Sequence, residues 1–208
     1  MGNKSPPIIR ARLIMVRNSG KRCADLDLKT PSDRTTFETL LQDCDILIDG
    51  YRPDALPRLG YGPAQLSAIA AKRGKGIIYV NENCFGYSGE WASRPGWQQI
   101  ADCVSGVAWG QGLAMGINEP MVPPFPMSDY GTGIMGAIVA LQGVYNRAVK
   151  GGSWWGGVSL VGYDMFLFKL GMYPDEVWYS PKPPSPINFF LSAICDGTDL
   201  KGGYQKGT

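Results

Sequence analysis

Three short segments of the sequence carry side chains that could bind or attack a ligand. Residues 49–53 place a tyrosine, whose ring can stack on a base, next to an arginine, whose planar fork can pair with phosphate. Residues 81–89 contain a cysteine, a phenylalanine and two glycines that permit close backbone approach to a ligand. Residues 126–133 place Asp129 where a helix is expected to begin, and a carboxylate there is either a helix cap or a nucleophile.

Each segment also has a plain structural interpretation. Residues 49–53 could form a turn with an exposed arginine, and residues 81–89 an ordinary flexible loop. Asp129 could be a helix cap. From these residues alone, a turn is the favoured interpretation of residues 49–53, and a helix cap is the favoured interpretation of Asp129. For residues 81–89, a flexible loop and a binding loop are equally well supported.

The segments that must position these side chains alternate between strand and helix in the first half of the chain. Cys23–Leu28 is a candidate strand, and a helix with a capping residue and a proline in its first turn begins at Thr30. Residues 45–49 form a strand of buried type, a second helix begins at Pro63, and residues 76–81 form a third strand. This order predicts an α/β fold with a Rossmann-like parallel sheet and flanking helices, with ligands bound beyond the carboxyl ends of the strands.

The second half is more helical. Residues 97–109 are expected to form a helix that ends at the glycines of residues 110–112. A long helix from Asp129 carries an apolar stripe, and another apolar segment runs from Val158 to Tyr173. The stripe consists of Ile134, Ile138, Leu141 and Tyr145. Residues 1–173 are therefore assigned to one domain, and residues 174–208 to a proline-rich linker and tail.

Composition excludes several classes of protein. The 208 residues include 20 Lys and Arg against 18 Asp and Glu, a net charge of +2 that does not suggest a nucleic-acid partner. No apolar run approaches the roughly 20 residues of a membrane span. The chain has no histidine and no CxxC pair among its five cysteines, so we expect no metal site, no disulfide framework and no imidazole base. The cytoplasm is the expected compartment, with mitochondria and peroxisomes as alternatives.

The ordered set of loops resembles family III CoA-transferases, the CaiB–BaiF group. The resemblance begins near Gly20-Lys21-Arg22 and continues through residues 45–53, Phe85-Gly86, Arg94-Pro95-Gly96 and Ser128-Asp129. The resemblance covers about residues 17 to 170, and the sequence of residues 90–102 is most similar to that of the fungal members. The family is considerably longer, so the resemblance implies a partial large domain from a truncated or degenerate copy.

The resemblance implies a mechanism that needs no histidine. In this family an aspartate attacks an acyl-CoA thioester, and Asp129 is the matching residue. The substrates would be an acyl-CoA and a carboxylic acid, with no separate cofactor, and a homodimer is expected if a full-length form exists. The glycines after Asp129 would let the thioester come close. The residues expected to contact coenzyme A are Lys21, Arg22, Tyr51, Arg52, Phe85, Gly86 and Arg94. The alternative for Lys21, Arg22 and Arg94 is that they are solvated surface charges.

Two other functions remain as alternatives. Racemases of the family use a Gly-His-Asp motif, whereas this chain has Gly96-Trp97-Gln98, which counts against an acyl-CoA racemase or epimerase. The third hypothesis is an inactive remnant that binds coenzyme A. In either transferase or remnant, the missing second domain should leave apolar side chains exposed and favour self-association. The side chains expected there are Trp154, Trp155, Phe166, Phe168 and Trp178.

Overall fold

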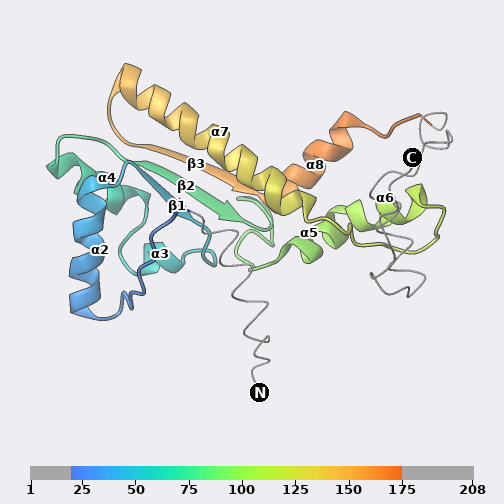
Figure 1. The fold of residues 1–208 in the computed structure, drawn as a ribbon, viewed down its shortest axis with the longest axis horizontal. Coiled ribbons are helices and arrows are strands. Elements are labelled where there is room, and N and C mark those ends of the chain that lie inside the picture. The colour runs from blue at the N-terminus through green and yellow to red at the C-terminus, as the bar shows by residue number, and fades with distance from the viewer. Residues whose placement is uncertain (1–19, 175–208) are drawn as a thin grey trace, which may run out of the picture.

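A computed structural model describes residues 20–174, which form helices and strands (Figure 1). The elements follow one another as α2 (Pro31–Asp43), β1 (Ile46–Asp49), α3 (Ala55–Arg58), α4 (Pro63–Lys72), β2 (Ile78–Asn83), α5 (Gln98–Ser105), α6 (Val107–Ala114), α7 (Met127–Lys150), β3 (Trp154–Ser159) and α8 (Leu160–Leu170). The predicted linker and tail, and Trp178 with them, lie outside the described residues. None of the helices described combines the length and apolar character that a membrane span requires.

The described strands form one parallel sheet in the order β1-β2-β3. Strand β2 is central, and its residues Ile78 to Asn83 pair in register with Trp154 to Ser159 of β3. Because the strands are parallel, all their carboxyl ends lie at the same edge, which is where open α/β sheets bind ligands. The predicted α/β class and parallel sheet are confirmed.

Helices cover both faces of the sheet. On one face, α2 and α4 enclose a core that includes Leu41, Leu66 and Tyr79. On the other face, α7 packs on β2 and β3 around Ile78 and Val80 (Figure 1). Covering a parallel sheet on both faces removes its largely apolar strands from water.

Helix α7 presents a different side to the sheet from the one that its sequence suggests. The predicted apolar stripe exists, but its members are exposed, with Ile138 at 60% and Leu141 at 68%. The helix instead faces the sheet with small residues, among them Ala140 and Gly143. An added Cβ at Gly143 would lie 2.7 Å from Ile78, so the glycine allows the helix to lie close to the strand.

Some strands and helices differ in position or burial from what the sequence predicts. Cys23–Leu28 is not a strand. The strands predicted at residues 45–49 and 76–81 correspond to β1 and β2, and the sheet gains β3, Trp154–Ser159, where no strand was expected. Strand β1 is buried on one face only: it lies at an edge of the described sheet, and Ile48 is 67% exposed because α7 packs on β2 and β3. The helix predicted over residues 97–109 ends earlier, at Gly106, whose φ of 90° is the left-handed conformation that glycine adopts readily.

Local signals in the sequence explain where two helices begin. The side chain of Thr30 accepts a hydrogen bond from the backbone N–H of Asp33, and Pro31 occupies the first turn, as predicted for α2. Ser159, the last residue of β3, caps α8 by accepting from the N–H of Gly162 at 3.0 Å. A single residue therefore ends the strand and starts the helix.

Arg73, which follows α4, forms hydrogen bonds that connect the end of α2 with the segments before β1 and β2. Its guanidinium group donates to the carbonyl oxygens of Leu41, Gln42 and Cys44 at 3.0, 2.6 and 2.6 Å. It also donates to the carbonyl of Gly76, which precedes β2. The end of α2, the start of β1 and the approach to β2 thus share one planar donor, a geometry that lysine cannot reproduce.

We expect Arg73→Ala to destabilise the fold by about 2–3 kcal/mol, because it removes charge-assisted hydrogen bonds and leaves half-buried carbonyls without a donor. For a chain of this size the melting temperature should fall by roughly 5–10 °C. Thermal unfolding followed by circular dichroism measures the change. Lys72→Ala, at the exposed neighbouring position, is the control. Equal decreases of the melting temperature in the two variants would show that the hydrogen bonds of Arg73 do not stabilise the fold.

Candidate functional site

A pocket of about 360 Å³ lies at the carboxyl end of the sheet, where the loop after β1 faces the segment after β2. We call it the strand-end pocket. Its lining includes Tyr51, Arg52, Glu82, Cys84, Arg94 and Trp97. Three of the residues predicted to contact coenzyme A therefore line one cavity: Tyr51 and Arg52 from the loop after β1, and Arg94 from a segment about 40 residues further along.

The loop after β1 has a fixed shape. Asp49, at the end of the strand, is buried and accepts a hydrogen bond from the backbone N–H of Tyr51 at 3.0 Å. The hydroxyl of Tyr79 donates to the other oxygen of Asp49 at 2.6 Å. This arrangement turns the chain so that Tyr51 is 68% exposed and Arg52 lies in solvent beside it. The turn interpretation and the binding interpretation of this segment are thus compatible.

Arg94 reaches the pocket from the opposite wall. Its guanidinium group lies 4.9 Å from the centre of the Trp91 ring, a cation–π contact that limits the movement of the side chain. Together with Arg52, it gives the pocket two positive charges, which suit an anionic ligand such as a phosphate.

Asp129 lies in the first turn of α7 and is half-buried. It is not the cap of that helix: Pro126 occupies the cap position, and no side chain there accepts a hydrogen bond from the helix. A carboxylate in the first turn is close to backbone N–H groups that have no partner within the helix. Asp129 does not itself line the strand-end pocket.

A buried polar network holds the turn that carries Asp129. Ser128 donates its hydroxyl to one oxygen of Asp102 on α5, and the amide of Gln98 donates to the other oxygen at 2.7 Å. All three residues are buried. Gln98 stands where the racemase motif has its aspartate, but it is used here to hold Asp102.

A second buried carboxylate adjoins this network. Asp164 of α8 accepts a hydrogen bond from the hydroxyl of Ser105 at 3.0 Å, while its other oxygen has no partner. Burial raises the pKa of Asp164, and repulsion from Asp102 acts in the same direction. Local sequence patterns do not predict this network, because its members are separated by up to 66 positions, from Gln98 to Asp164.

The glycines after Asp129 have different roles. An added Cβ at Gly131 would overlap the ring of Tyr163, so this glycine allows α7 and α8 to pack closely. Gly133 has open space around it. The expectation that both glycines admit a thioester therefore fails for Gly131, which serves helix packing.

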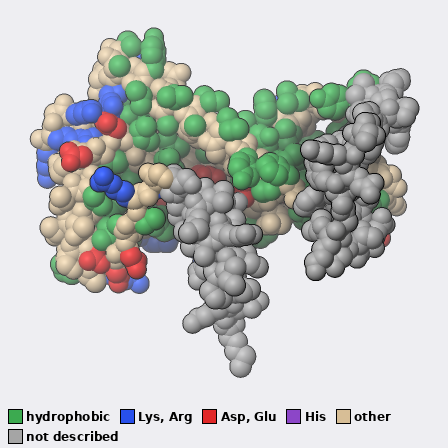
Figure 2. All heavy atoms as spheres, in the orientation of Figure 1, with side chains coloured by type: hydrophobic (Ala, Val, Ile, Leu, Met, Phe, Trp, Pro, Cys, Tyr) green, Lys and Arg blue, Asp and Glu red, His purple; other side chains and the backbone are tan. Residues whose placement is uncertain are grey.

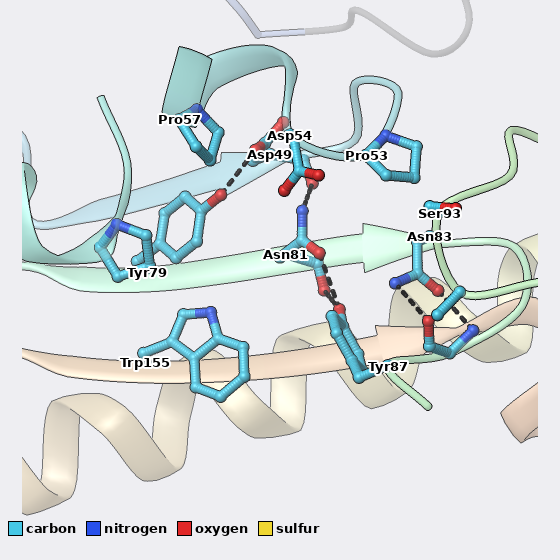
Figure 3. A pocket seen from close by; sticks show the side chains of 13 residues that line it. Asp49, Pro53, Asp54, Pro57, Tyr79, Asn81, Asn83, Tyr87, Ser93 and Trp155 are labelled. Carbon is cyan, nitrogen blue, oxygen red and sulfur yellow. Dashed lines mark hydrogen bonds between the residues drawn. The ribbon is translucent and has the colours of Figure 1, made fainter. Parts of the chain in front are cut away.

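A second pocket, of about 320 Å³, lies on the face of the sheet opposite α7 (Figure 3). It contains a chain of hydrogen bonds in which the Tyr87 hydroxyl donates to Asn81 and the Asn81 amide donates to the carbonyl of Asp49. Burial raises the pKa of Tyr87 to about 12, so the phenol remains a donor at neutral pH. Hydrogen bonds among its own lining residues therefore fix the positions of the Tyr87 and Asn81 side chains in this pocket.

The remaining predicted contacts do not share one cavity. Gly86 lines the second pocket, whereas Phe85 packs in a cluster with Cys84 and stacks edge-on against Trp91. Lys21 and Arg22 are exposed before α2 and line neither pocket. Of the seven predicted contacts, three therefore line the strand-end pocket.

Among the described residues, Cys84 is the cysteine that lines the strand-end pocket. Burial raises its pKa to about 11, and the charges of Asp164 and Asp102 add to the effect. The thiol is therefore neutral near pH 7 and a poor nucleophile. Among the residues described, no cluster of His, Cys, Asp or Glu could hold a metal ion. In the part of the chain that the structure describes, carboxylates such as Asp129 and Glu82 remain as candidate nucleophiles near this edge of the sheet.

Comparison with known proteins gives the class. Residues 9–163 match the model of CoA-transferase family III, and the chain belongs to that family. The acetyl-coenzyme A transferase nodX of Hypoxylon pulicicidum is 41% identical over 162 residues, which are 77% of this chain and 27% of that protein. An acyl-CoA transferase of Gibberella moniliformis is 40% identical over 163 residues, 76% of this chain and 29% of that protein. The chain thus spans less than a third of these curated relatives.

A solved structure agrees on the fold. The D175A mutant of Rv3272 from Mycobacterium tuberculosis superposes with a TM-score of 0.64 at 23% identity, over 73% of this chain and 40% of that one. The described sheet and helices therefore correspond to part of a larger fold.

Proposed function

We propose that this chain is the nucleophile-bearing part of an acyl-CoA:carboxylate CoA-transferase. Its substrates are an acyl-CoA and a carboxylic acid, and no cofactor beyond the coenzyme A thioester is required. The observation that supports this most strongly is the position of Asp129. It precedes Thr132 by one turn of α7, and the Thr132 hydroxyl reaches the carbonyl of Ser159 at the carboxyl end of β3. This is the sheet edge where Tyr51, Arg52 and Arg94 line one pocket.

The chemistry follows from these positions. A carboxylate oxygen of Asp129 attacks the thioester carbonyl carbon, and the C–S bond breaks to give a mixed anhydride and the coenzyme A thiolate. The thiolate then attacks the aspartyl carbonyl, which releases the donor acid and leaves an aspartyl-CoA thioester. The acceptor acid reverses both steps. Charge is conserved throughout, so no proton acceptor such as histidine is needed.

Racemisation is less well supported. It needs a base that removes the α-proton, and the chain has no histidine. Gln98, at the position of the motif's acid, is buried against Asp102. Uptake of solvent deuterium at the α-carbon of an acyl-CoA distinguishes the two activities, since the transferase mechanism leaves that carbon untouched. Binding without turnover would instead favour the inactive remnant.

We expect Arg52→Ala to weaken coenzyme A binding about 10- to 100-fold, because an arginine–phosphate pair contributes about 1.5–3 kcal/mol. Isothermal titration calorimetry with coenzyme A measures the change. Arg58→Ala removes an exposed arginine of α3 that does not line the pocket, and it serves as the control. If both variants bind as wild type does, Arg52 is only a turn residue.

A further inference from the structure

Helix α8 packs on α5 and on α7, close to the first turn of α7 (Figure 1). The closest approach to α7 is made by Tyr163, whose ring an added Cβ at Gly131 would overlap. Asp164 is the next residue of α8, and it is fully buried at 0% exposure. Leu160, one turn earlier, is buried as well, so the two side chains share the side of α8 that faces the protein interior.

Asp164 has only part of the hydrogen-bonding environment that a buried anion needs. One of its oxygens accepts from the hydroxyl of Ser105 at 3.0 Å, and the other has no hydrogen-bond partner among the described residues. An ionised carboxylate buried without a cation or a full set of donors is strongly unfavourable. A neutral carboxyl group needs fewer donors and supplies one itself. The contacts of Asp164 therefore fit the neutral form.

The neighbouring carboxylate has the opposite environment. Asp102 of α5 is also fully buried, but each of its oxygens has a donor: the Ser128 hydroxyl on one and the Gln98 amide on the other. Of two buried carboxyl groups that are close together, one retains its proton, because two like charges there repel each other. The hydrogen bonds assign the charge to Asp102 and the proton to Asp164.

The other titratable groups around Asp164 do not supply a positive charge. Asp102 is the acid on α5, Asp129 is the acid in the first turn of α7, and β3 carries no charged side chain. Cys84, after β2, lies near enough for Asp164 to raise its pKa, and Lys169 of α8 is exposed. Burial raises the pKa of Asp164 and Asp102 raises it further, while hydroxyl groups act in the other direction. These shifts agree with the hydrogen-bond pattern.

Ser128 connects the two carboxyl groups. Its hydroxyl has a single hydrogen, which is donated to Asp102, and its lone pairs remain available to a donor. The same hydroxyl is close enough to Asp164 to influence its pKa through a hydrogen bond. If both carboxyls were ionised, they would compete for one hydrogen. Since Ser128 directly precedes Asp129, the outcome bears on the turn that carries the nucleophile.

We propose that Asp164 is neutral and is a positioning residue for Asp129: it donates its proton to Ser128, which donates in turn to Asp102, and the three helices together fix the first turn of α7. This inference rests on the proposed function, in which Asp129 attacks the thioester. Asp164 exchanges no proton with the substrate. At high pH it loses the proton, which removes a donor and leaves two buried negative charges around one hydroxyl, and the turn then loosens.

The first test does not depend on activity. Carboxyl-labelled aspartate followed by NMR gives the titration midpoint of Asp164, which is assigned by its absence from Asp164→Asn. The midpoint should lie well above that of the exposed Asp43, and it should move to lower pH in Asp102→Asn, because a repulsive charge is removed. A midpoint in the ordinary aspartate range would contradict the neutral carboxyl group.

The pH dependence of stability gives a second measurement. Folded Asp164 binds a proton that the unfolded chain releases at lower pH, so its contribution to the free energy of unfolding is fully present below the pKa of an unfolded aspartate. This contribution should be lost as the pH rises to the pKa of folded Asp164. Urea unfolding at a series of pH values should show the decline in wild type and in Asp43→Asn, the exposed control, but not in Asp164→Asn. An identical decline in Asp164→Asn would assign it to another group.

Turnover tests the positioning role. In wild type, kcat should fall as the pH passes the midpoint of Asp164, with little change in KM. Asp164→Asn keeps an N–H donor at every pH, so it should retain turnover and lose this decline. Asp164→Leu cannot donate and should lower kcat about 100-fold, the scale of loss when a reacting group is displaced by about 1 Å. Equal kcat values for the two variants would overturn the positioning role.

The remaining outcomes are also decisive. If Asp164→Leu does not fold, the pH profile of Asp164→Asn against wild type decides, and a decline of kcat that persists in Asp164→Asn would overturn the proposal. A wild-type chain with a raised Asp164 midpoint but no turnover would contradict the proposed function and the positioning role, while leaving the neutral carboxyl group in place.

Discussion

Replacing Asp129 by asparagine should reduce CoA-transferase turnover at least about a thousandfold, the scale of loss when an enzyme loses its nucleophile. Asparagine has nearly the same size and can occupy the first turn of α7, but its amide cannot form the anhydride or the aspartyl thioester. The loss should appear in kcat, because the pocket residues Tyr51, Arg52 and Arg94 remain in place. Transfer of coenzyme A between a donor thioester and an acceptor acid, followed by chromatography, measures it.

The control for this substitution separates chemistry from folding. Asp43→Asn makes the same change at an exposed position that ends α2. Both variants should melt within a few degrees of wild type and bind coenzyme A equally well. Full turnover by Asp129→Asn would show that Asp129 is not the nucleophile. If the variant loses both turnover and its fold, covalent trapping in the wild-type chain decides whether Asp129 is the nucleophile.

The chain should also self-associate. Helix α7 carries an apolar stripe whose side chains are 60–68% exposed, namely Ile134, Ile138, Leu141, Tyr145 and Val149. Figure 2 shows apolar side chains gathered over this helix. Trp155, Phe166 and Phe168 are exposed as well, as expected from the sequence, while Trp154 is half-buried. An apolar surface of this extent favours association.

Light scattering should therefore give a mass well above that of a 22.6 kDa monomer at micromolar concentration. Leu141→Glu places a charge in the middle of the stripe and should shift the chain strongly toward monomer without lowering its melting temperature. Gln42→Glu adds the same charge to an exposed position of α2 and should leave the association unchanged. A monodisperse wild-type monomer would contradict the expectation.

The sequence predicts the α/β class because periodic apolar runs and helix caps are local signals. Thr30 and Pro31 mark the start of α2, and residues 76–81 mark most of β2. Strand β3 is harder to predict, because Trp154 to Gly157 contains two glycines and no β-branched residue. The orientation of α7 is also not local, since an apolar stripe shows that a helix has a distinct side but not which side meets the sheet.

The candidate site is predicted in part for the same reason. Asp129, Tyr51 and Arg52 follow strand ends or open a helix, which are positions where ligands bind. The sequence pattern places Glu82 in a loop that starts at residue 81, whereas pairing with β3 extends β2 as far as Asn83. Had the strand been extended by two residues, the alternation of Ile78, Val80 and Glu82 would have shown a carboxylate in line with the core. The buried partners of Ser128 come from distant segments that no local pattern connects.

Covalent trapping tests the central claim most directly. The full chain is incubated with a reactive acyl-CoA and then with hydroxylamine, which converts an aspartyl anhydride or thioester into a stable hydroxamate. Peptide mass spectrometry should locate the hydroxamate on Asp129 in wild type, at the start of α7, and find none in Asp129→Asn. A hydroxamate on another carboxylate, or turnover with no trapped residue, would contradict the assignment of Asp129 as the nucleophile.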